Sequence, residues 1–486
     1  MSLTASDPDS APVELPRKAV DWLLRAGRFL DEGYLENARL ALRQADAMAP
    51  DEAPIYRGLA AGYRVAGLAA EAGVAEMAAI AFEQRSAPML YNLATSFLMT
   101  QKPVGAERWY RACLRFDPDM VAAHQNLASI MEVDGRAEFA RYHRDQAYGR
   151  QSIFIDQSEN AQLTVLILCT AATGNVPFEW LLPQTRFNRV RWVMEYARDE
   201  QFESLPEFDL VFNAIGDHDV SPASQAAMAR LLAGCDKPVL NLPQAVALTA
   251  RENLPTLFDN INHLLAPKAL RLQYGQGSEH LRHNGMTTPF LIRPIAAHGG
   301  KGLRLYATEE QLAQASWPSD AAHVCAFHDY RSEDGFFRKY RVIFIGGKPY
   351  PYHLAISENW LVHYATADML HHQWKRDEEL RFLAYPAAVL GWSAMQALRS
   401  MGRRLELDFF GVDCSILPDG RLLVFEANAT MLVHLEEFHA ELQFKNPYVQ
   451  KILDAFDALL KQKTNRACER RWAPDHNVHA DLQRAG

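Results

Sequence analysis

The chain has 486 residues, more than one typical domain, and predicts two to four domains. Hydrophobic residues make up 49% of it, enough for sizeable cores, and the net charge of −9 argues against a general nucleic-acid surface. Six cysteines are scattered without a CxxC pair, which excludes a disulfide framework or an ordinary zinc motif. The sequence contains no membrane-spanning apolar run and starts without a signal peptide, so we expect a cytoplasmic protein.

A repeat of 34 residues organises the N-terminal part of the chain. Its blocks begin at Ala19, Ala53, Ala87 and Val121, with alanine at the eighth and twentieth places of each block. Small residues at fixed places let paired helices pack closely. The pattern resembles tetratricopeptide (TPR) repeats over residues 19–154, which implies an all-α solenoid whose groove binds a peptide or protein. A spacer or dimerisation element is the alternative, and a homo-oligomer is compatible with it.

Residues 160–250 predict a small α/β domain with a parallel sheet. Apolar runs mark its strands, and Ser221 followed by Pro222 marks the start of a helix. The loop after the first strand, residues 170–177, is not a GxGxxG motif. The predicted strands are Leu163–Cys169, Asn188–Met194, Phe208–Asp217 and Pro238–Asn241.

Further along, a strand ends at Arg293 and is followed by a glycine-rich loop. Glycines let backbone N–H groups turn onto phosphate oxygens, and a lysine in the loop adds positive charge. A glycine-rich hairpin loop without a ligand is the alternative. The loop residues are His298, Gly299, Gly300, Lys301 and Gly302.

Lys339 and Arg341 lie two places apart in a run of predicted strands, residues 336–356, and therefore share one face. Two cations so close on one face favour an anionic ligand, although a solvent-facing pair is the alternative.

A β-hairpin is predicted at residues 407–430, with Asp419-Gly420 as a two-residue turn. That register places Asp413 opposite Glu426, with Asn428 on the same face. Opposed like charges are destabilising, so a cation between them is expected, and these oxygen ligands suit Mg²⁺. The opposite, core face of the hairpin would carry Val412, Cys414, Ile416, Leu423, Phe425 and Ala427.

The hairpin, the glycine-rich loop and the paired cations together resemble the ATP-grasp superfamily. The resemblance implies ATP and Mg²⁺ as cofactors, with Arg341, Arg293 and Lys301 beside the transferred phosphate. It further implies Arg251, Lys339 and the glycine-rich loop as ATP contacts. The base would lie against the hinge residues Ala326 and Phe327, and Asp329 would serve the ribose.

The sequence therefore predicts a multidomain protein. It has a disordered tail (1–18), the TPR-like solenoid (19–154), an α/β pre-ATP-grasp domain (160–250), an α+β ATP-grasp domain (251–462) and a flexible tail (463–486). The resemblance implies an ADP-forming ligase that activates a carboxylate as an acyl phosphate and joins it to an amine. A kinase that phosphorylates a small molecule and a nucleotide-sensing TPR scaffold are the alternatives. No nucleic-acid or membrane partner is expected.

Overall fold

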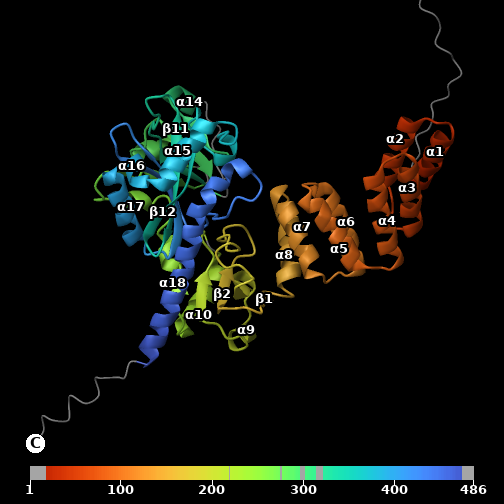
Figure 1. Ribbon diagram of the computed structural model, residues 1–486, viewed down its shortest axis with the longest axis horizontal. Helices are drawn as coiled ribbons and strands as arrows, with labels where there is room; N and C mark the ends of the chain where they lie inside the picture. Colours follow the sequence, from red (N-terminus) through yellow and green to blue (C-terminus); the bar gives the residue numbers. More distant parts are fainter. Residues whose placement is uncertain are drawn as a thin grey trace, which may run out of the picture. The chain divides into compact units, whose positions relative to one another are not determined.

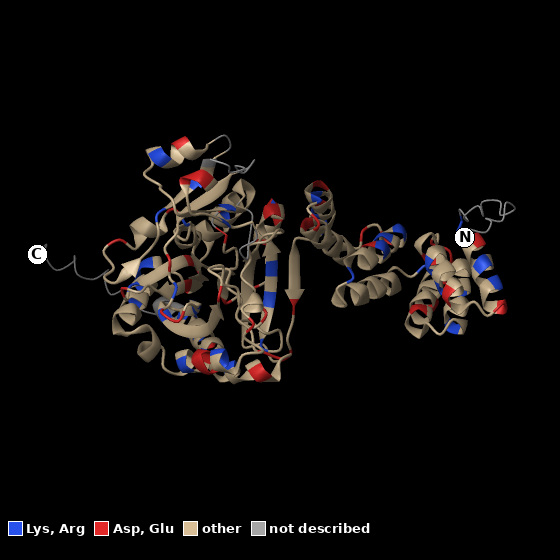
Figure 2. Cartoon of the chain, turned by 90° about the horizontal axis from the view of Figure 1, so that it is seen from above, with Lys and Arg blue, Asp and Glu red and all other residues tan. Residues whose placement is uncertain are grey.

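The computed structural model describes residues 18–472 except 218, 220, 274–275, 296–301 and 314–320, and describes only the backbone at 313 and 466–472. The chain divides into two compact units between Gln151 and Ser152. Basic and acidic residues are interspersed along both units (Figure 2). Within the described residues, no helix is both long and apolar enough to cross a membrane.

Helix pairs with a 34-residue period form residues 19–148 (Figure 1). Each pair begins at a predicted block start, and the recurrent alanines are at most 5% exposed. The turn between the two helices of a pair contains a residue with a positive φ, which is a glycine such as Gly33 in three of the four described pairs. In the pair that begins at Ala87 this residue is Gln101, whose φ of 57° keeps the same left-handed turn. Within the described chain the pairs are α1 (Ala19–Asp31) with α2 (Leu35–Ala47), α3 (Ala53–Val65) with α4 (Ala69–Glu83), α5 (Ala87–Met99) with α6 (Pro103–Phe116), and α7 (Val121–Val133) with α8 (Ala137–Tyr148).

A buried histidine pair joins α7 to α8. The Nδ1 atoms of His124 and His143 are 2.7 Å apart, and His124 Nε2 lies 2.9 Å from the carbonyl oxygen of Pro118. Because that carbonyl only accepts, His124 donates from Nε2 and accepts at Nδ1, and His143 Nδ1 is the donor. Burial is the main cause that lowers the pKa of His143, to about 4, and the neighbouring His124 lowers it further.

Acid should therefore destabilise the end of the helical unit. An unfolded histidine titrates near about 6.5, so the unfolded state binds more protons and stability falls as the pH drops from there towards about 4. Hydrogen exchange over residues 121–148, corrected for intrinsic rates, should show less protection at about pH 5.5 than at about pH 7.5. The difference should shrink in His143→Gln. Equal protection of the wild-type protein at both pH values would contradict a buried neutral pair.

The second unit begins with a sheet whose strand order is β1-β3-β2-β4-β5 over the described residues. Strands β2 to β5 are parallel, as predicted, and the sequence analysis missed β1, an antiparallel edge strand. Helix α10 (Pro222–Gly234) starts where predicted, and Ser221 Oγ accepts from the Ser224 N–H at 3.2 Å. The strands are β1 (Ile153–Asp156), β2 (Leu163–Cys169), β3 (Phe187–Val193), β4 (Leu210–Asn213) and β5 (Val239–Leu240).

Two further sheets follow in the same unit. The smaller, antiparallel one has the described order β7-β10-β8-β9, from β7 (Ala269–Leu272), β8 (Phe290–Pro294), β9 (Arg304–Tyr306) and β10 (Ala322–Ala326). The larger, which we call the central sheet, has the described order β12-β11-β13-β14-β6. Its strands are β6 (Leu264–Leu265), β11 (Phe337–Ile345), β12 (Lys348–Ser357), β13 (Phe409–Ile416) and β14 (Leu422–Asn428).

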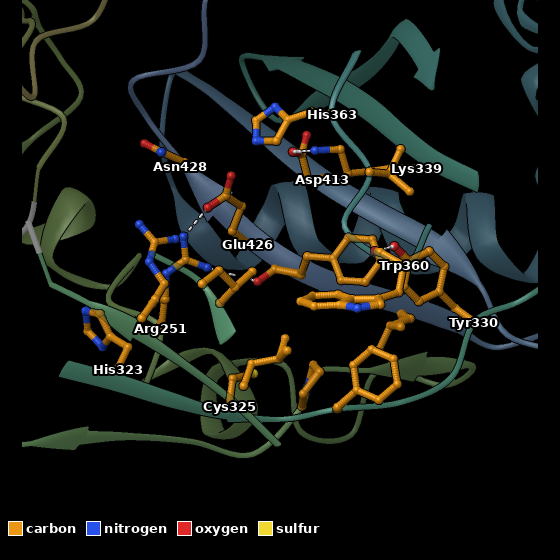
Figure 3. A pocket seen from close by; sticks show the side chains of 18 of the residues that line it. Arg251, His323, Cys325, Tyr330, Lys339, Trp360, His363, Asp413, Glu426 and Asn428 are labelled. Atoms are coloured by element: carbon orange, nitrogen blue, oxygen red, sulfur yellow. Dashed lines mark hydrogen bonds and ion pairs between the residues drawn. The ribbon is translucent and has the colours of Figure 1, made fainter. Parts of the chain in front are cut away.

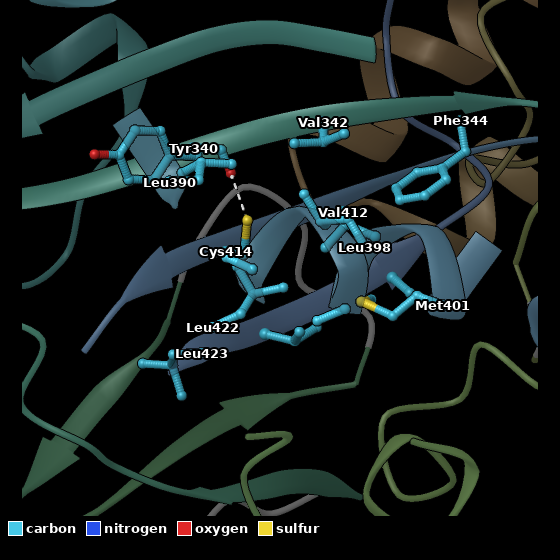
Figure 4. Close-up of a cluster of buried hydrophobic side chains, with 14 of the residues drawn as sticks. Tyr340, Val342, Phe344, Leu390, Leu398, Met401, Val412, Cys414, Leu422 and Leu423 are labelled. Carbon is cyan, nitrogen blue, oxygen red and sulfur yellow. Dashed lines mark hydrogen bonds between the residues drawn. The ribbon is translucent and has the colours of Figure 1, made fainter. Parts of the chain in front are cut away.

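Helices bury the apolar side chains of the central sheet. Leu398 and Met401 of α17 (Trp392–Leu405) pack against Val412 and Phe344 in one core, together with α15 (Gln373–Ala384) and α16 (Pro386–Leu390) (Figure 4). Phe456 of α18 (Asn446–Trp472) packs in a second core that the central sheet shares with the α/β sheet. Helix α18 thus continues into the segment expected to be a flexible tail, and residues 473–486 lie outside the described residues.

Candidate active site

The predicted pairing of Asp413 with Glu426 is present in the β13–β14 hairpin. The predicted two-residue turn is wrong, because the Leu417 N–H donates to the Arg421 carbonyl oxygen and closes a three-residue loop. A β-bulge after Asp413 then restores the expected register. Leu423 and Phe425, predicted on the core face, pack with the core of the central sheet and also line a cavity beside Glu426.

Four charged or polar side chains form a row across the central sheet. The strand registers pair His353 with Arg341, Arg341 with Asp413, and Asp413 with Glu426, so the row crosses β12, β11, β13 and β14. Register irregularities lie at Arg341 and at Asp413, within the row itself. Bulges commonly re-aim side chains at functional sites, which fits this position.

Asp413 is held by two cations from the neighbouring strand. Arg341 donates from Nε to Oδ1 at 2.6 Å and from Nη2 to Oδ2 at 2.9 Å. Lys339 Nζ lies 3.2 Å from Oδ2 (Figure 3). Burial by itself raises the pKa of Asp413, but the charges of Arg341 and Lys339 outweigh it and hold the pKa well below its usual range. Asp413 is therefore an ionised carboxylate although its side chain is only 4% exposed.

Glu426 is held by a different cation. Arg251 Nη2 donates to Glu426 Oε2, and Arg251 Nη1 donates to the Phe425 carbonyl oxygen at 3.2 Å (Figure 3). Burial raises the pKa of Glu426, yet the charge of Arg251 shifts it below its ordinary value. Arg293 also lines the cavity, where burial and then the charge of Arg251 lower its pKa to about 10. Arg293 and Arg251, which the family resemblance implied as ATP contacts, thus line one cavity.

Asn428 lines the same cavity as the two carboxylates, and its Oδ1 accepts from the N–H and hydroxyl of Thr430, both at 2.7 Å. It pairs with Gly411, where an added Cβ would lie 2.4 Å from Met431 Cγ, so glycine leaves room for Met431 over the strand. Among the described residues, no cluster of three or more His, Cys, Asp or Glu side chains could hold a metal ion. The set Asp413, Glu426 and Asn428 is of another kind, because its third oxygen ligand would be the side-chain amide of Asn428.

These residues line a cavity of about 380 Å³ between the central sheet and the smaller antiparallel sheet. Its charged end is lined by Arg341, Asp413 and Glu426 of that row, and its other end is largely apolar and aromatic. Phe327 and Trp360 meet there edge to face, with ring centroids 5.8 Å apart, and the Tyr330 hydroxyl donates to the Trp360 carbonyl oxygen (Figure 3). Neither Tyr330 nor Trp360 was singled out from the sequence: Tyr330 ends the hinge run, and Trp360 lies in no periodic pattern or motif.

The predicted hinge residues lie in different places. Ala326 and Phe327 line the cavity, but their N–H groups already donate to the carbonyl oxygens of Lys268 and Pro289, at 2.9 and 3.0 Å. Asp329 is exposed and accepts from the Arg331 N–H at 3.0 Å, and it does not belong to the described lining. His328, which the sequence analysis did not single out, lines the cavity instead.

The glycine-rich loop falls mostly beyond what the structure describes. His298, Gly299, Gly300 and Lys301 lie outside the described residues. Gly302 is described, with a φ of 73°, and an added Cβ there would lie 3.1 Å from Pro294 Cδ.

A buried polar cluster supports the segment that carries Trp360 and His363. Tyr364 donates to Glu379 Oε2 at 2.9 Å and accepts from Lys445 Nζ at 3.0 Å, and its ring packs at a tilt against that of His353, with centroids 4.8 Å apart. Burial raises the pKa of Glu379 to about 7. The cluster joins the cavity wall to α15 and to η3 (Ala440–Lys445), so it fixes the wall relative to the central sheet.

Several solved structures are similar to this chain. The chain is similar to the D-alanine–D-alanine ligase of Bacillus anthracis complexed with ATP, at 10% identity over 63% of this chain and 99% of that one, with a TM-score of 0.41. It is similar to the VanG D-Ala:D-Ser ligase of Enterococcus faecalis, at 14% identity, 61% and 99% coverage and a TM-score of 0.36. A third is the ATP-grasp ligase PsnB complexed with minimal precursor, Mg and ADP, at 14% identity, 61% and 98% coverage and a TM-score of 0.36. No family model and no curated protein matches the chain.

Removing Arg341 should destabilise the second unit. Arg341→Ala leaves Asp413 buried with only Lys339 beside it, and breaking a buried ion pair costs about 3–5 kcal/mol. The matched control is Arg421→Ala in the same hairpin, whose pair with Asp419 is about half exposed and should contribute little to stability. Denaturant unfolding followed by tryptophan fluorescence measures both. Equal, small losses in the two variants would contradict a buried pair at Asp413.

Proposed function

We propose that the second unit is an ATP-grasp enzyme that binds a magnesium nucleoside triphosphate in the cavity. The observation that carries the proposal is the charge of the described lining, where four cationic side chains face two carboxylates. The surplus of two positive charges suits a polyanion, and the apolar, aromatic end suits a nucleobase. The cations are Arg251, Arg293, Lys339 and Arg341, and the carboxylates are Asp413 and Glu426.

The donor set fits Mg²⁺. Two ionised carboxylates and one amide oxygen line the same part of the cavity, and Mg²⁺ prefers oxygen ligands completed by water and phosphate. We propose Asp413, Glu426 and Asn428 as its protein ligands. When bound there, the ion would neutralise charge on the phosphates. The cavity also offers the aromatic rings of Phe327 and Trp360 to a base.

The proposed reaction is ADP-forming ligation of a carboxylate to an amine. A substrate carboxylate attacks the γ-phosphorus of ATP, the bond to the β-phosphate oxygen breaks, and ADP leaves with an acyl phosphate formed. The amine then attacks the acyl carbon, loses a proton and expels phosphate. In this scheme Arg251 and Lys339 hold the triphosphate, while Arg341 and Arg293 offset charge around the transferred group. Lys301 is proposed for the same task from the family resemblance alone.

A carboxylate acceptor agrees with the lining better than a hydroxyl does. A kinase acting on a hydroxyl benefits from a general base, and carboxylates commonly fill that role. Both carboxylates in the described lining are engaged by arginine. A substrate carboxylate is ionised at neutral pH and needs no such base. On the carboxylates alone this difference favours the ligase, and a kinase would take its general base from the cavity histidines His323, His328 and His363.

Glu426→Gln should lower ADP release at least about 100-fold, because the amide keeps the shape but loses the charge that would hold the metal. The assay is ADP release with Mg²⁺-ATP, screened over amino acids, peptides and small carboxylic acids. Glu437→Gln serves as the control, since Glu437 is exposed and does not line the cavity. Turnover in Glu426→Gln equal to that of the control would refute the metal assignment.

For the helical unit we propose recruitment of a peptide or protein partner. Three apolar residues recur at the 34-residue period at the ends of α3, α5 and α7, and are strongly exposed: Val65 (70%), Met99 (81%) and Val133 (80%). Their regular spacing favours a shared binding surface.

The second unit is compact by itself, so residues 152–486 should retain ATP affinity and activity on a small acceptor but lose at least about tenfold in kcat/KM on a large one. Isothermal titration with nucleotide and ADP-release assays on both acceptors test this. Unchanged activity on every acceptor would remove the proposed role of the helical unit.

A further inference from the structure

Both carboxylates of the proposed metal site are occupied by protein cations in the ligand-free chain. Both oxygens of Asp413 contact Arg341, at 2.6 and 2.9 Å, and Glu426 Oε2 contacts Arg251. A metal ion bound to either carboxylate would therefore compete with a guanidinium for the charge of that carboxylate and weaken the ion pair. The two ion pairs differ in how easily they are weakened, because the two arginines are held differently.

Arg341 is the more firmly held of the two. It lies inside β11, between β12 and β13, and meets Asp413 with two parallel N–H···O bonds where the carboxylate is only 4% exposed. Arg251 instead lies in the turn between α11 (Pro243–Ala247) and α12 (Leu254–Leu257). Its side chain and that of Glu426 are each 22% exposed, and a single nitrogen makes the contact. The Arg251–Glu426 pair is thus the exchangeable one.

We propose that Arg251 blocks the metal site on Glu426 until a nucleotide arrives. The proposal rests on the proposed function and adds a coupling to it. A metal ion alone would release Arg251 from Glu426 and leave its charge beside Arg293 without a counter-ion. A nucleotide alone would draw Arg251 to its phosphates and leave the half-buried Glu426 unpaired. When both bind, Glu426 would contact the metal ion instead of Arg251, and Arg251 would contact the phosphates, so that each charged group would again have a partner of opposite charge.

The exchange of partners predicts that metal and nucleotide each raise the affinity of the protein for the other. This effect would add to the direct affinity of the metal ion for phosphate. Coupling between sites typically changes affinity about 5–150-fold. Replacing Arg251 removes the competitor of the metal, so the metal should then bind in the absence of nucleotide. Because the gain comes from Glu426, it should vanish when Glu426 is also replaced.

Mn²⁺ binding to the full chain without nucleotide, followed by the electron paramagnetic resonance of free Mn²⁺, tests the proposal. Arg251→Gln should bind Mn²⁺ about tenfold tighter than the wild-type protein. The matched control, Arg421→Gln, removes an exposed arginine–carboxylate pair of the same hairpin and should leave the affinity unchanged. The double variant Arg251→Gln with Glu426→Gln should lose the gain. Arg251→Lys, which keeps the charge but not the planar donor group, should show a smaller gain and serves if Arg251→Gln does not fold.

Absence of any gain in Arg251→Gln, or in Arg251→Lys if the first variant does not fold, would overturn the proposal. A gain that persists in the double variant would overturn it as well, since Glu426 would not be the ligand. A separate measurement tests the proposed function: if the wild-type protein binds no nucleotide in the presence of Mn²⁺, the proposed function fails. The gain of Mn²⁺ affinity in Arg251→Gln does not depend on that result.

Discussion

Asp413 and Glu426 face each other on adjacent strands, and their mutual repulsion is the constraint around which the site is built. Two carboxylates at this separation destabilise a sheet unless opposite charges lie close by. In the ligand-free chain, Arg341 and Lys339 offset one carboxylate and Arg251 offsets the other. The arrangement is costly to bury, so its presence in the wall of a cavity indicates a ligand that uses these charges.

The surrounding fold brings these charges together from distant parts of the chain. Arg251 comes from the turn after α11, Arg293 from the smaller sheet, and Arg341 and Asp413 from the central sheet. Only the folded second unit places them around one cavity, with an apolar and aromatic end for a less polar group. The bulge after Asp413 contributes to both ends, since it keeps Glu426 opposite Asp413 and turns Phe425 towards the cavity.

Regular patterns made much of this predictable from the sequence. The 34-residue period predicted the start of each helix pair, and strand alternation predicted that Lys339 and Arg341 share one face. In the structure both of them contact Asp413 from that face. The register at Asp413 was predicted correctly despite the wrong turn, because the longer loop and the bulge offset each other. Irregular backbone explains what was missed. Trp360 and Tyr330 reach the cavity from segments without periodicity. No sequence pattern predicts the carbonyl oxygens that accept from the N–H groups of Ala326 and Phe327. The same is true of the ion pair between Arg251 and Glu426.

The measurement that tests the account most directly is a crystal structure of the full chain with Mn²⁺ and a non-hydrolysable ATP analogue. The account predicts an anomalous manganese signal among Asp413, Glu426 and Asn428. It also predicts phosphates against Arg251 and Arg293, with the base beside Phe327 and Trp360. Manganese and nucleotide bound away from this cavity, or a cavity left without nucleotide at saturating concentration, would contradict it.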